Sequence, residues 1–286
     1  MPQPLSTLLS DATEALADAS PAPQLDAELL LAHALGQERS YLRAHAGEVP
    51  DAAALERFEK LIAARRRGEP IAYLTSKREF WSLELKVTPA TLIPRHETEL
   101  LVELALQRIP GDAEWDLLDL GTGSGAIALA LARERPRCRV TATDLSPTAL
   151  TVATENAASL QVRNVTFLTG DWFAPLTGRR FHMIVSNPPY IRERDPHLAQ
   201  GDLRFEPRTA LAAGLDGLGD LRRIGTAAPL HLENGAWLLL EHGYDQGTDV
   251  RELLHVEGYA DITTFRDLQG KERVTGAMRT EACAPR

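Results

Sequence analysis

Apolar residues in the first 75 positions recur every three or four residues, which is the spacing of amphipathic helices. Two stretches show this spacing most clearly, QLDAELLLAHALG (24–36) and AAALERFEKLIAARRRG (52–68). Gly36 and Gly68 follow the apolar positions as helix stop signals. We therefore expect residues 1–75 to form a small helical domain.

The pattern of apolar and polar residues changes after position 75. Across REFWSLELKV, apolar side chains alternate in part with polar ones, which is typical of a strand or hairpin. The apolar positions are Phe80, Leu83, Leu85 and Val87. We predict that residues 76–94 form a β-hairpin connector.

From position 95 onward, short apolar runs of strand length alternate with helical stretches. The strand-like segments are WDLLDLG, RVTATDL, VTFLTGD, FHMIVSN, AWLLLEHG, DITTFRD and ERVTGAM. This alternation predicts an α/β fold with a mainly parallel, seven-stranded sheet that is covered by helices on both faces. The last two strands lie close together in the chain, which suggests a terminal antiparallel hairpin. We expect residues 95–286 to form this Rossmann-like domain.

Composition indicates a globular protein of a reducing compartment. The chain has 286 residues, 44% of them hydrophobic, which is enough for one large core and a second small one. Cys138 and Cys283 cannot build a disulfide framework, and neither they nor the eight scattered histidines have metal-ligand spacing. We expect no metal site. The first twenty residues lack the segments of a secretory leader, and no apolar run reaches the about 18 residues of a membrane span. We expect a cytoplasmic protein without a membrane partner.

The formal net charge of -9 argues against a nucleic-acid duplex as the main partner, because phosphate binding depends chiefly on Lys and Arg. The densest basic cluster is Arg65 to Arg67, at the end of a predicted helix. Cations are favourable there because they face the negative pole of the helix dipole. We interpret this cluster as a solvated helix end.

A glycine-rich turn follows the first strand of the α/β region, in DLGTGSGAIALA. Its glycines allow a tight turn and close approach of a ligand, while the next helix points unpaired amides at whatever binds there. The same residues also satisfy the G-x-G-x-x-A pattern of dinucleotide folds, and such turns occur without a ligand. The candidate cofactor-binding residues of this turn are Gly121, Thr122, Gly123, Ser124 and Gly125.

Acidic residues end the next two strands. Asp144 lies one strand-helix-strand unit after the glycines, where a carboxylate can accept hydrogen bonds from both hydroxyls of a ribose. The alternative role of Asp144 as a helix cap is already taken by Ser146, which is followed by a proline.

In GDWF, Asp171 could accept a hydrogen bond from an adenine amino group, and Trp172 or Phe173 could cover the ring. Buried aromatic residues are also common as simple core. These strand ends together favour an adenosine-containing ligand, which leaves S-adenosylmethionine and a nicotinamide cofactor as alternatives. The fourth strand decides between them, because a hydride-transfer enzyme usually supplies an acid-base group to a carbonyl. The segment SNPPYI offers a neutral amide instead, so methyl transfer fits better.

The segment Asn187-Pro188-Pro189-Tyr190 fits the activation of a planar amino group, whose lone pair is delocalised. The Asn187 side-chain oxygen can accept one N–H and the Pro188 carbonyl the other, and proline fixes the direction of that carbonyl. Both dipoles stabilise the positive charge that develops on the nitrogen during attack. Tyr190 can stack on the flat group. An ordinary turn after a strand is the alternative interpretation.

At this point the chain resembles the peptide chain release factor glutamine N5-methyltransferase family, the PrmC or HemK type. The resemblance covers nearly the full length. The stretches that carry it are RRRGEPIAYLTSKREFWSL, VTPATLIPRHETELLVE, LDLGTGSGAIALALA, SNPPYI, RFEPRTAL, LLLEHGYDQG and RDLQGKERV. The tetrapeptide NPPY alone is shared with DNA adenine and other amino methyltransferases, whereas the ensemble is specific.

The resemblance implies a class I S-adenosylmethionine-dependent methyltransferase fold behind an N-terminal domain that helps to dock the release factor. The implied acceptor is the glutamine amide of the Gly-Gly-Gln loop of class I release factors, with S-adenosylhomocysteine as product. It also implies that the glycine turn binds the methionine end of the cofactor, Asp144 the ribose and Trp172 the adenine. Asn187 would lie beside both cofactor and substrate, and Asn187 to Tyr190 would hold the glutamine amide.

Two positions depart from the pattern expected of this family. His96 stands where the family often has proline, and Ser76 stands where glycine is common. The roles of Arg95, Glu97, Glu99, Phe205 and Glu206 stay open, because acidic residues in a first helical turn are also explained by the helix dipole.

Two rival functions remain. The tetrapeptide could act on an exocyclic amine of a flipped DNA or RNA base, which the acidic net charge disfavours. A cofactor-binding module without catalytic activity is the other, and the intact Asn187 argues against it.

Overall fold

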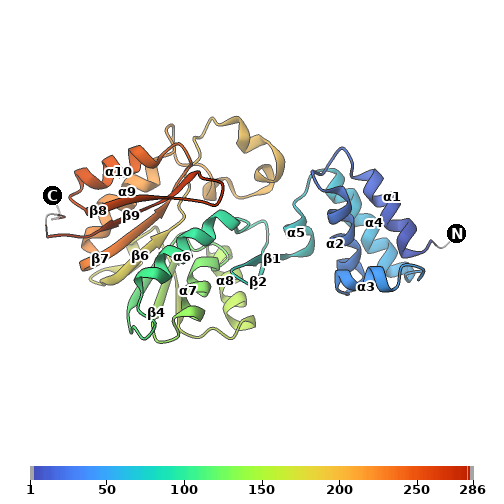
Figure 1. The fold of residues 1–286 in the computed structure, drawn as a ribbon, viewed down its shortest axis with the longest axis horizontal. Coiled ribbons are helices and arrows are strands. Elements are labelled where there is room, and N and C mark those ends of the chain that lie inside the picture. The colour runs from blue at the N-terminus through green and yellow to red at the C-terminus, as the bar shows by residue number, and fades with distance from the viewer. Residues whose placement is uncertain (1–2, 282, 284–286) are drawn as a thin grey trace. The chain divides into compact units, whose positions relative to one another are not determined.

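The computed structural model describes residues 3–281 and residue 283. The chain divides into two compact units (Figure 1). The first runs to Lys77 and also includes Ala199–Phe205, and the second comprises Arg78–Leu198 and the chain from Glu206 onward. The boundaries expected at residues 75 and 94 stay a prediction. Among the helices that the structure describes, none has the length and apolar character needed to cross a lipid bilayer.

The first unit is helical. Its helices are α1 (Leu5–Ala15), α2 (Pro23–Leu35), α3 (Arg39–Ala44), α4 (Ala52–Arg66) and α5 (Ile71–Thr75). Helix α2 contacts the other four and is the centre of the bundle. Leucines, alanines and Phe58 fill the core between the helices. The apolar spacing in this part of the sequence therefore produces the helices that it predicts.

Arg65 corrects one interpretation made from the sequence. Its side chain is 8% exposed, and its Nε donates to the buried carboxylate of Asp26 over 2.7 Å. Nη1 donates to the carbonyl of Glu69 at 3.0 Å and lies 3.5 Å from Asp202. The interpretation of Arg65 to Arg67 as a solvated helix end is therefore wrong for Arg65. A buried charge requires a partner, and Asp26 lies on another helix, so local sequence does not reveal the pair.

The second unit begins with a two-stranded sheet and continues as an α/β domain. The strands of the small sheet are β1 (Lys77–Phe80) and β2 (Leu83–Lys86). Their four apolar residues, Phe80, Leu83, Leu85 and Val87, are all buried. Trp81 and Ser82 form the turn between them with φ angles of 51° and 56°. Two consecutive positive φ angles match the twist that a tight hairpin requires.

The large sheet has seven strands in the order β5-β4-β3-β6-β7-β9-β8 (Figure 1). They are β3 (Asp116–Leu120), β4 (Arg139–Asp144), β5 (Val165–Thr169), β6 (Phe181–Ser186), β7 (Leu232–Glu241), β8 (Ala260–Arg266) and β9 (Glu272–Met278). Pairs among β3 to β7 are parallel, and β9 is antiparallel to both β7 and β8. The predicted mainly parallel sheet and its terminal hairpin are confirmed.

Helices cover both faces of the sheet. The α-helices are α6 (Glu99–Arg108), α7 (Ala126–Glu134), α8 (Pro147–Ser159), α9 (Gly219–Ala227) and α10 (Gly247–Val256). The short helical turns are η1 (His96–Thr98), η2 (Ala174–Leu176), η3 (Pro196–Ala199), η4 (Gly201–Phe205), η5 (Arg208–Ala210) and η6 (Ala228–Leu230).

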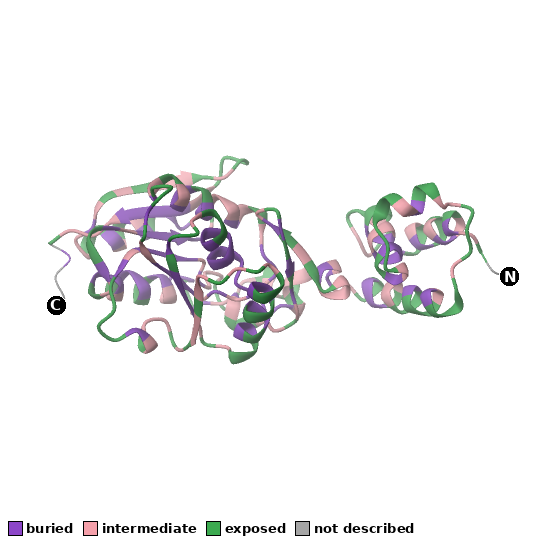
Figure 2. Ribbon diagram, turned by 90° about the horizontal axis from the view of Figure 1, so that it is seen from below, coloured by how far each residue is buried: buried purple, intermediate pink, exposed green. Residues whose placement is uncertain are grey.

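Successive strand residues point to opposite sides of the sheet, so a central strand contributes side chains to the hydrophobic cores on both faces. Leu117 packs with α6 and α7, whereas its neighbour Leu118 packs with α9 and α10. The inner strands β3, β4 and β6 are almost entirely buried, and Figure 2 shows buried strands within this domain. Burial on both faces explains why the strands are nearly continuous apolar runs in the sequence.

Several loops meet at the carboxyl ends of the central strands. The chain runs outward from β3 through β4 to β5, then returns to add β6 on the other side of β3. Leu120 pairs with Ser186 at the ends of β3 and β6, and the Ser186 hydroxyl donates to the Leu120 carbonyl at 2.8 Å. Gly121 and Asn187 are the next residues along each strand. A ligand crevice forms at such a reversal, outside the carboxyl ends of the strands.

Ser76 ends α5 in the left-handed conformation, with φ 56°. A side chain in this conformation costs roughly 1 kcal/mol, which glycine avoids. We expect Ser76→Gly to raise the free energy of unfolding by about 0.5 kcal/mol, since the greater freedom of glycine in the unfolded chain offsets part of the gain. Urea denaturation followed by circular dichroism measures this change.

Gly36→Ser is the matched control for that variant. Gly36 ends α2 with φ 66°, and a Cβ built there meets nothing within 4 Å. Strain of the same size, offset in part by the lower freedom of serine in the unfolded chain, predicts a loss of about 0.5 kcal/mol. A destabilised Ser76→Gly protein would contradict the assignment of strain to Ser76.

Candidate active site

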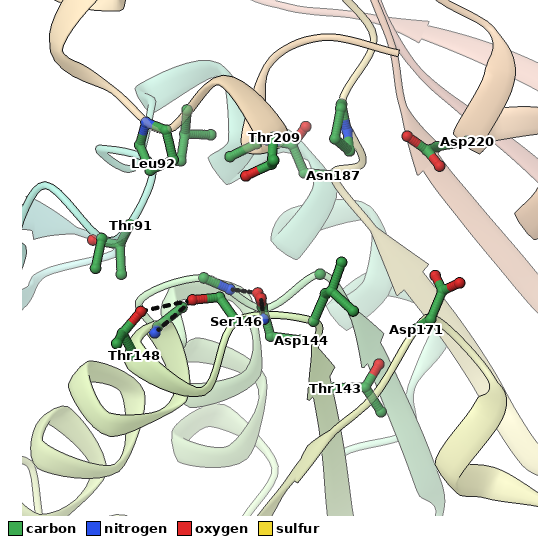
Figure 3. A pocket seen from close by; sticks show the side chains of 18 of the residues that line it. Thr91, Leu92, Thr143, Asp144, Ser146, Thr148, Asp171, Asn187, Thr209 and Asp220 are labelled. Atoms are coloured by element: carbon green, nitrogen blue, oxygen red, sulfur yellow. Dashed lines mark hydrogen bonds between the residues drawn. The ribbon is translucent and has the colours of Figure 1, made fainter. Parts of the chain in front are cut away.

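A cavity of about 400 Å³ lies at the carboxyl ends of the central strands (Figure 3). Its walls come from residues 89–92 after β2, from the loops after β3, β4, β5 and β6, from residues 207–210 and from α9. This is the size of a small-molecule site. In Figure 3, Asn187 lies across the cavity from Asp144 and Asp171.

The glycine turn after β3 forms one wall. Gly121 has φ 72°, and a Cβ built on it would meet the Trp172 ring at 3.1 Å. Gly125 precedes α7 with φ 85°, and a Cβ there would lie 3.2 Å from that of Ala153. Glycine is required at both positions, by conformation and by close packing. Gly121 and Gly123 line the cavity.

Asp144 is held firmly at the end of β4. Its Oδ2 accepts from the backbone N–H of Gly123 at 2.8 Å, and its Oδ1 accepts from that of Ser146 at 2.9 Å. The Ser146 hydroxyl caps α8 by accepting from Ala149 N. Ser146 therefore supplies the cap, as the sequence indicates. A carboxylate has about four acceptor positions, so Asp144 keeps capacity for a ligand in the cavity.

Asp119 lies beneath the glycine turn and is buried. Its Oδ2 accepts from the Thr122 hydroxyl at 2.6 Å and from Ala128 N at 3.2 Å. Oδ1 is buried and has no hydrogen-bond partner among the described residues. Burial raises the pKa of Asp119 to about 7, with a smaller contribution from Asp144. Asp119 therefore supports the turn and the start of α7 from below, without lining the cavity.

The residues after β5 lie at the opposite side of the cavity from Asn187. Asp171 lines the cavity and pairs with Arg223 at 2.6 Å. Trp172 also lines it, and its Nε1 donates to Asp220 at 3.3 Å. Phe173 instead stacks on a histidine ring, with the two ring centroids 4.6 Å apart. Of the two aromatic residues suggested as a cover for a base, only Trp172 reaches the cavity.

Asn187 has a fixed amide orientation. Its Nδ2 donates to the Thr98 hydroxyl at 3.1 Å, and Thr98 ends the turn η1. The carbonyl oxygen Oδ1 is therefore the free end of the amide in the cavity wall. Pro189 also lines the cavity, whereas Pro188 is buried behind it. An amide oxygen presented in this way can accept a hydrogen bond from a ligand N–H.

Tyr190 is linked to a buried carboxyl group. Its hydroxyl lies 3.3 Å from Oε1 of Glu241, the last residue of β7. Burial raises the pKa of Tyr190 and also raises the pKa of Glu241 to about 7. The Thr98 hydroxyl and the charge of Arg273 oppose the effect of burial on Glu241. Glu241 thus holds the Tyr190 hydroxyl, as Thr98 holds the Asn187 amide.

The cavity brings together seven of the residues predicted from the sequence. They are Gly121, Gly123, Asp144, Asp171, Trp172, Asn187 and Pro189. Five others do not line it, namely Thr122, Ser124, Gly125, Pro188 and Tyr190. Thr122 and Ser124 are buried and Gly125 begins the helix. Within residues 3–281 and 283, no three His, Cys, Asp or Glu side chains are grouped to hold a metal ion. The individual roles of the site residues stay predictions.

Known proteins resemble this chain along almost its entire length. Residues 7–75 match the PrmC N-terminal domain, and residues 96–203 match the methyltransferase small domain. A release factor glutamine methyltransferase from Pseudomonas aeruginosa is 54% identical over 271 residues, which cover 95% of this chain and 97% of that protein. One of the same name from Vibrio cholerae is 52% identical, over 97% of this chain and 98% of that protein. The chain belongs to the release factor glutamine methyltransferase family.

A solved structure also supports the fold. A methyltransferase from Pyrococcus furiosus superposes with a TM-score of 0.52 at 17% sequence identity, covering 69% of this chain and 89% of that one. The family and the fold together identify this member as a methyltransferase, and the resemblance noted from its sequence motifs is confirmed.

Several residues whose roles the sequence left open have structural partners in this family member. Glu206 is buried, accepts from Ile93 N at 3.0 Å and pairs with Arg95. Glu99 accepts from the backbone N–H of Trp81 at 3.0 Å. His96, where the family often has proline, is 69% exposed. These contacts hold the segment between the hairpin and α6 and do not enter the cavity.

Three residues at the site escaped sequence reasoning, namely Asp119, Thr98 and Glu241. The two acids follow short leucine runs at the buried ends of β3 and β7, in LLDLG and LLLEHG. A carboxylate in a buried strand is costly unless it has a purpose, so this pattern was an available signal. Thr98 gives no such signal, because its partner Asn187 lies 89 positions away.

We expect Glu241→Gln to change how stability depends on pH. The folded-state pKa of Glu241 is raised from 4.5 to about 7, so in this window unfolding releases a proton. The wild type is therefore stabilised at low pH and loses that contribution as pH rises toward 7, whereas Gln does not titrate. Between pH 6 and pH 8 the wild type should lose about 1 kcal/mol relative to Glu241→Gln. Urea denaturation of both proteins at these pH values measures the difference, and parallel pH profiles would contradict the raised pKa.

Proposed function

We propose that the chain transfers the methyl group of S-adenosylmethionine to the side-chain amide nitrogen of the glutamine in the Gly-Gly-Gln motif of class I peptide chain release factors, supporting translation termination. The observation that carries this proposal is the orientation of Asn187. Its Nδ2 is bound by Thr98, so the free Oδ1 suits a ligand that donates an N–H. The choice of glutamine as the acceptor and of a release factor as the substrate rests on the names of the relatives from Pseudomonas and Vibrio.

The residues around the cavity fit the chemical groups of this cofactor. Asp144, fixed by two backbone N–H groups, would accept from the ribose hydroxyls. Trp172 and Asp171 would hold the adenine, and the glycine turn would take the methionine end. S-adenosylmethionine, when bound, supplies a methyl group activated by a sulfonium and leaves as S-adenosylhomocysteine.

The tetrapeptide would activate the glutamine amide. Asn187 Oδ1 and the Pro188 carbonyl would each accept one of its two N–H groups, which draws the nitrogen toward tetrahedral geometry and frees its lone pair. The same dipoles stabilise the positive charge that builds on nitrogen as it attacks. The ring of Tyr190 would fix the plane of the amide.

Positioning would supply most of the remaining rate advantage. The tetrapeptide has to hold the nitrogen about 3 to 3.5 Å from the methyl carbon, in line with the bond that breaks. It contains no basic side chain, and none is needed, because the attack leaves a positively charged, N-methylated amide nitrogen that readily loses one proton to water and gives the neutral N-methylamide. The N-terminal helical domain would help to dock the release factor in the cytoplasm, with neither a membrane nor a stable nucleic-acid partner.

Asn187→Ala should separate cofactor binding from methyl transfer. We expect S-adenosylmethionine to bind within about threefold of wild type, because the variant removes an interaction with the attacking group. Turnover should fall by ~10²–10³-fold, as when one preorganised dipole is removed from an oxyanion hole. Calorimetry and a methylation assay measure the two quantities. Asn234→Ala, at an exposed position, is the control. Normal turnover by Asn187→Ala would refute the mechanism.

The choice of substrate requires a separate assay. Purified enzyme with labelled cofactor is offered a release factor, the same factor with its loop glutamine changed to alanine, and adenine-containing DNA. We expect label in the first alone, because alanine offers no side-chain N–H groups to the clamp and the net charge of -9 disfavours DNA. Equal labelling of both factors, or preference for the DNA, would contradict the glutamine assignment.

A further inference from the structure

The hydrogen bond between Asn187 and Thr98 implies a second acceptor. Thr98 Oγ1 accepts from Asn187 Nδ2 at 3.1 Å. A hydroxyl carries one proton, and because Oγ1 uses a lone pair for Asn187, this proton is available for another partner. Thr98 is only 4% exposed, so the partner has to belong to the protein.

Glu241 is the acceptor that fits. The Thr98 hydroxyl is near enough to this buried carboxyl to favour its charged form. The Oε2 atom of Glu241 is buried and has no hydrogen-bond partner among the described residues. Such an oxygen is costly to leave unpaired, and the free proton of Thr98 can reduce that cost. The other charged groups that face Glu241 are Arg273, of opposite sign, and Glu97, of the same sign.

The same carboxyl group also contacts Tyr190. The Tyr190 hydroxyl lies 3.3 Å from Glu241 Oε1. Tyr190 and Asn187 are the two side chains expected to contact the substrate amide, one through its ring and one through Oδ1. Glu241 thus lies behind the amide site: Tyr190 contacts it directly, and the Thr98 hydroxyl that holds Asn187 favours its charged form.

We propose that Glu241 and Thr98 are positioning residues that hold Asn187 and Tyr190 in the geometry required for methyl transfer. Neither would touch the substrate. Without the Thr98 hydroxyl, the Asn187 amide can rotate by about 180° and present Nδ2 to the substrate N–H. Both groups are hydrogen-bond donors, so the substrate then loses its acceptor. The proposal rests on the proposed function for the identity of the acceptor, whereas the orientation of Asn187 can be tested without it.

The first test needs no substrate. The side-chain NH₂ signals of Asn187 are assigned in a ¹⁵N-labelled protein by their loss in Asn187→Ala. We expect Thr98→Val, which keeps the side-chain shape and removes the hydroxyl, to shift these signals and speed their exchange with water. Thr98→Ser keeps the hydroxyl and should leave them near their wild-type positions. Unchanged Asn187 signals in Thr98→Val would overturn the proposal.

The second test is kinetic and uses the release factor. Thr98→Val should lower kcat by ~10–100-fold with KM little changed, the loss typical when the partner that orients a functional side chain is removed. Thr98→Ser should restore most of it. Glu241→Gln should lower kcat as well, and cofactor binding by both variants should stay near wild type.

A double-mutant cycle distinguishes positioning from a general structural defect. If Thr98 acts through Asn187, then Thr98→Val in the Asn187→Ala background should slow the enzyme by less than about twofold further, because the two losses share one cause. If the fall in kcat of the double variant equals the product of the falls in the two single variants, the proposal is overturned.

The outcomes separate this inference from the proposed function. Shifted Asn187 signals in Thr98→Val, together with a wild type that leaves the release factor unmethylated, would refute the proposed function and support the positioning role. If the wild type methylates the factor and Thr98→Val is as fast as the wild type, the proposed function is supported and the positioning role of Thr98 is refuted.

Discussion

The parallel pairing of β3 with β6 is the constraint on which the site depends. It places Leu120 beside Ser186, so the next residues, Gly121 and Asn187, emerge together at the point where the order of strands reverses. One of these residues begins the turn expected to bind the cofactor, and the other begins the segment expected to bind the acceptor. Methyl transfer requires two molecules to meet at a defined distance, and this pair of adjacent strand ends provides two such anchors.

Behind each anchor lies a buried carboxyl group. Asp119 holds the glycine turn through Thr122 and Ala128 N, and the Tyr190 hydroxyl lies 3.3 Å from Glu241. Burial raises the pKa of each acid to about 7, so both are costly to keep charged. Their presence at the buried ends of β3 and β7 is explained by the loops that they support, because a preorganised site needs rigid groups behind the residues that touch the ligand.

Sequence reasoning predicted the parts of this structure that depend on local pattern. Apolar runs bounded by glycine or acid marked the strands, and the rule that ligands bind at the carboxyl ends of parallel strands brought Asp144 and Asn187 to one cavity. The contacts that orient these side chains could not be predicted in this way. Arg65 looked solvated until its partner on another helix was known, and Thr98 meets Asn187 only after the sheet has formed.

The central claim is that a glutamine amide is held by two acceptors while its nitrogen faces the methyl donor. A crystal structure of the enzyme with S-adenosylhomocysteine and a Gly-Gly-Gln peptide tests it most directly. We expect the glutamine nitrogen within about 2.7 to 3.2 Å of both Asn187 Oδ1 and the Pro188 carbonyl oxygen. A glutamine whose carbonyl oxygen faces these two groups, or a peptide bound outside the cavity, would contradict it.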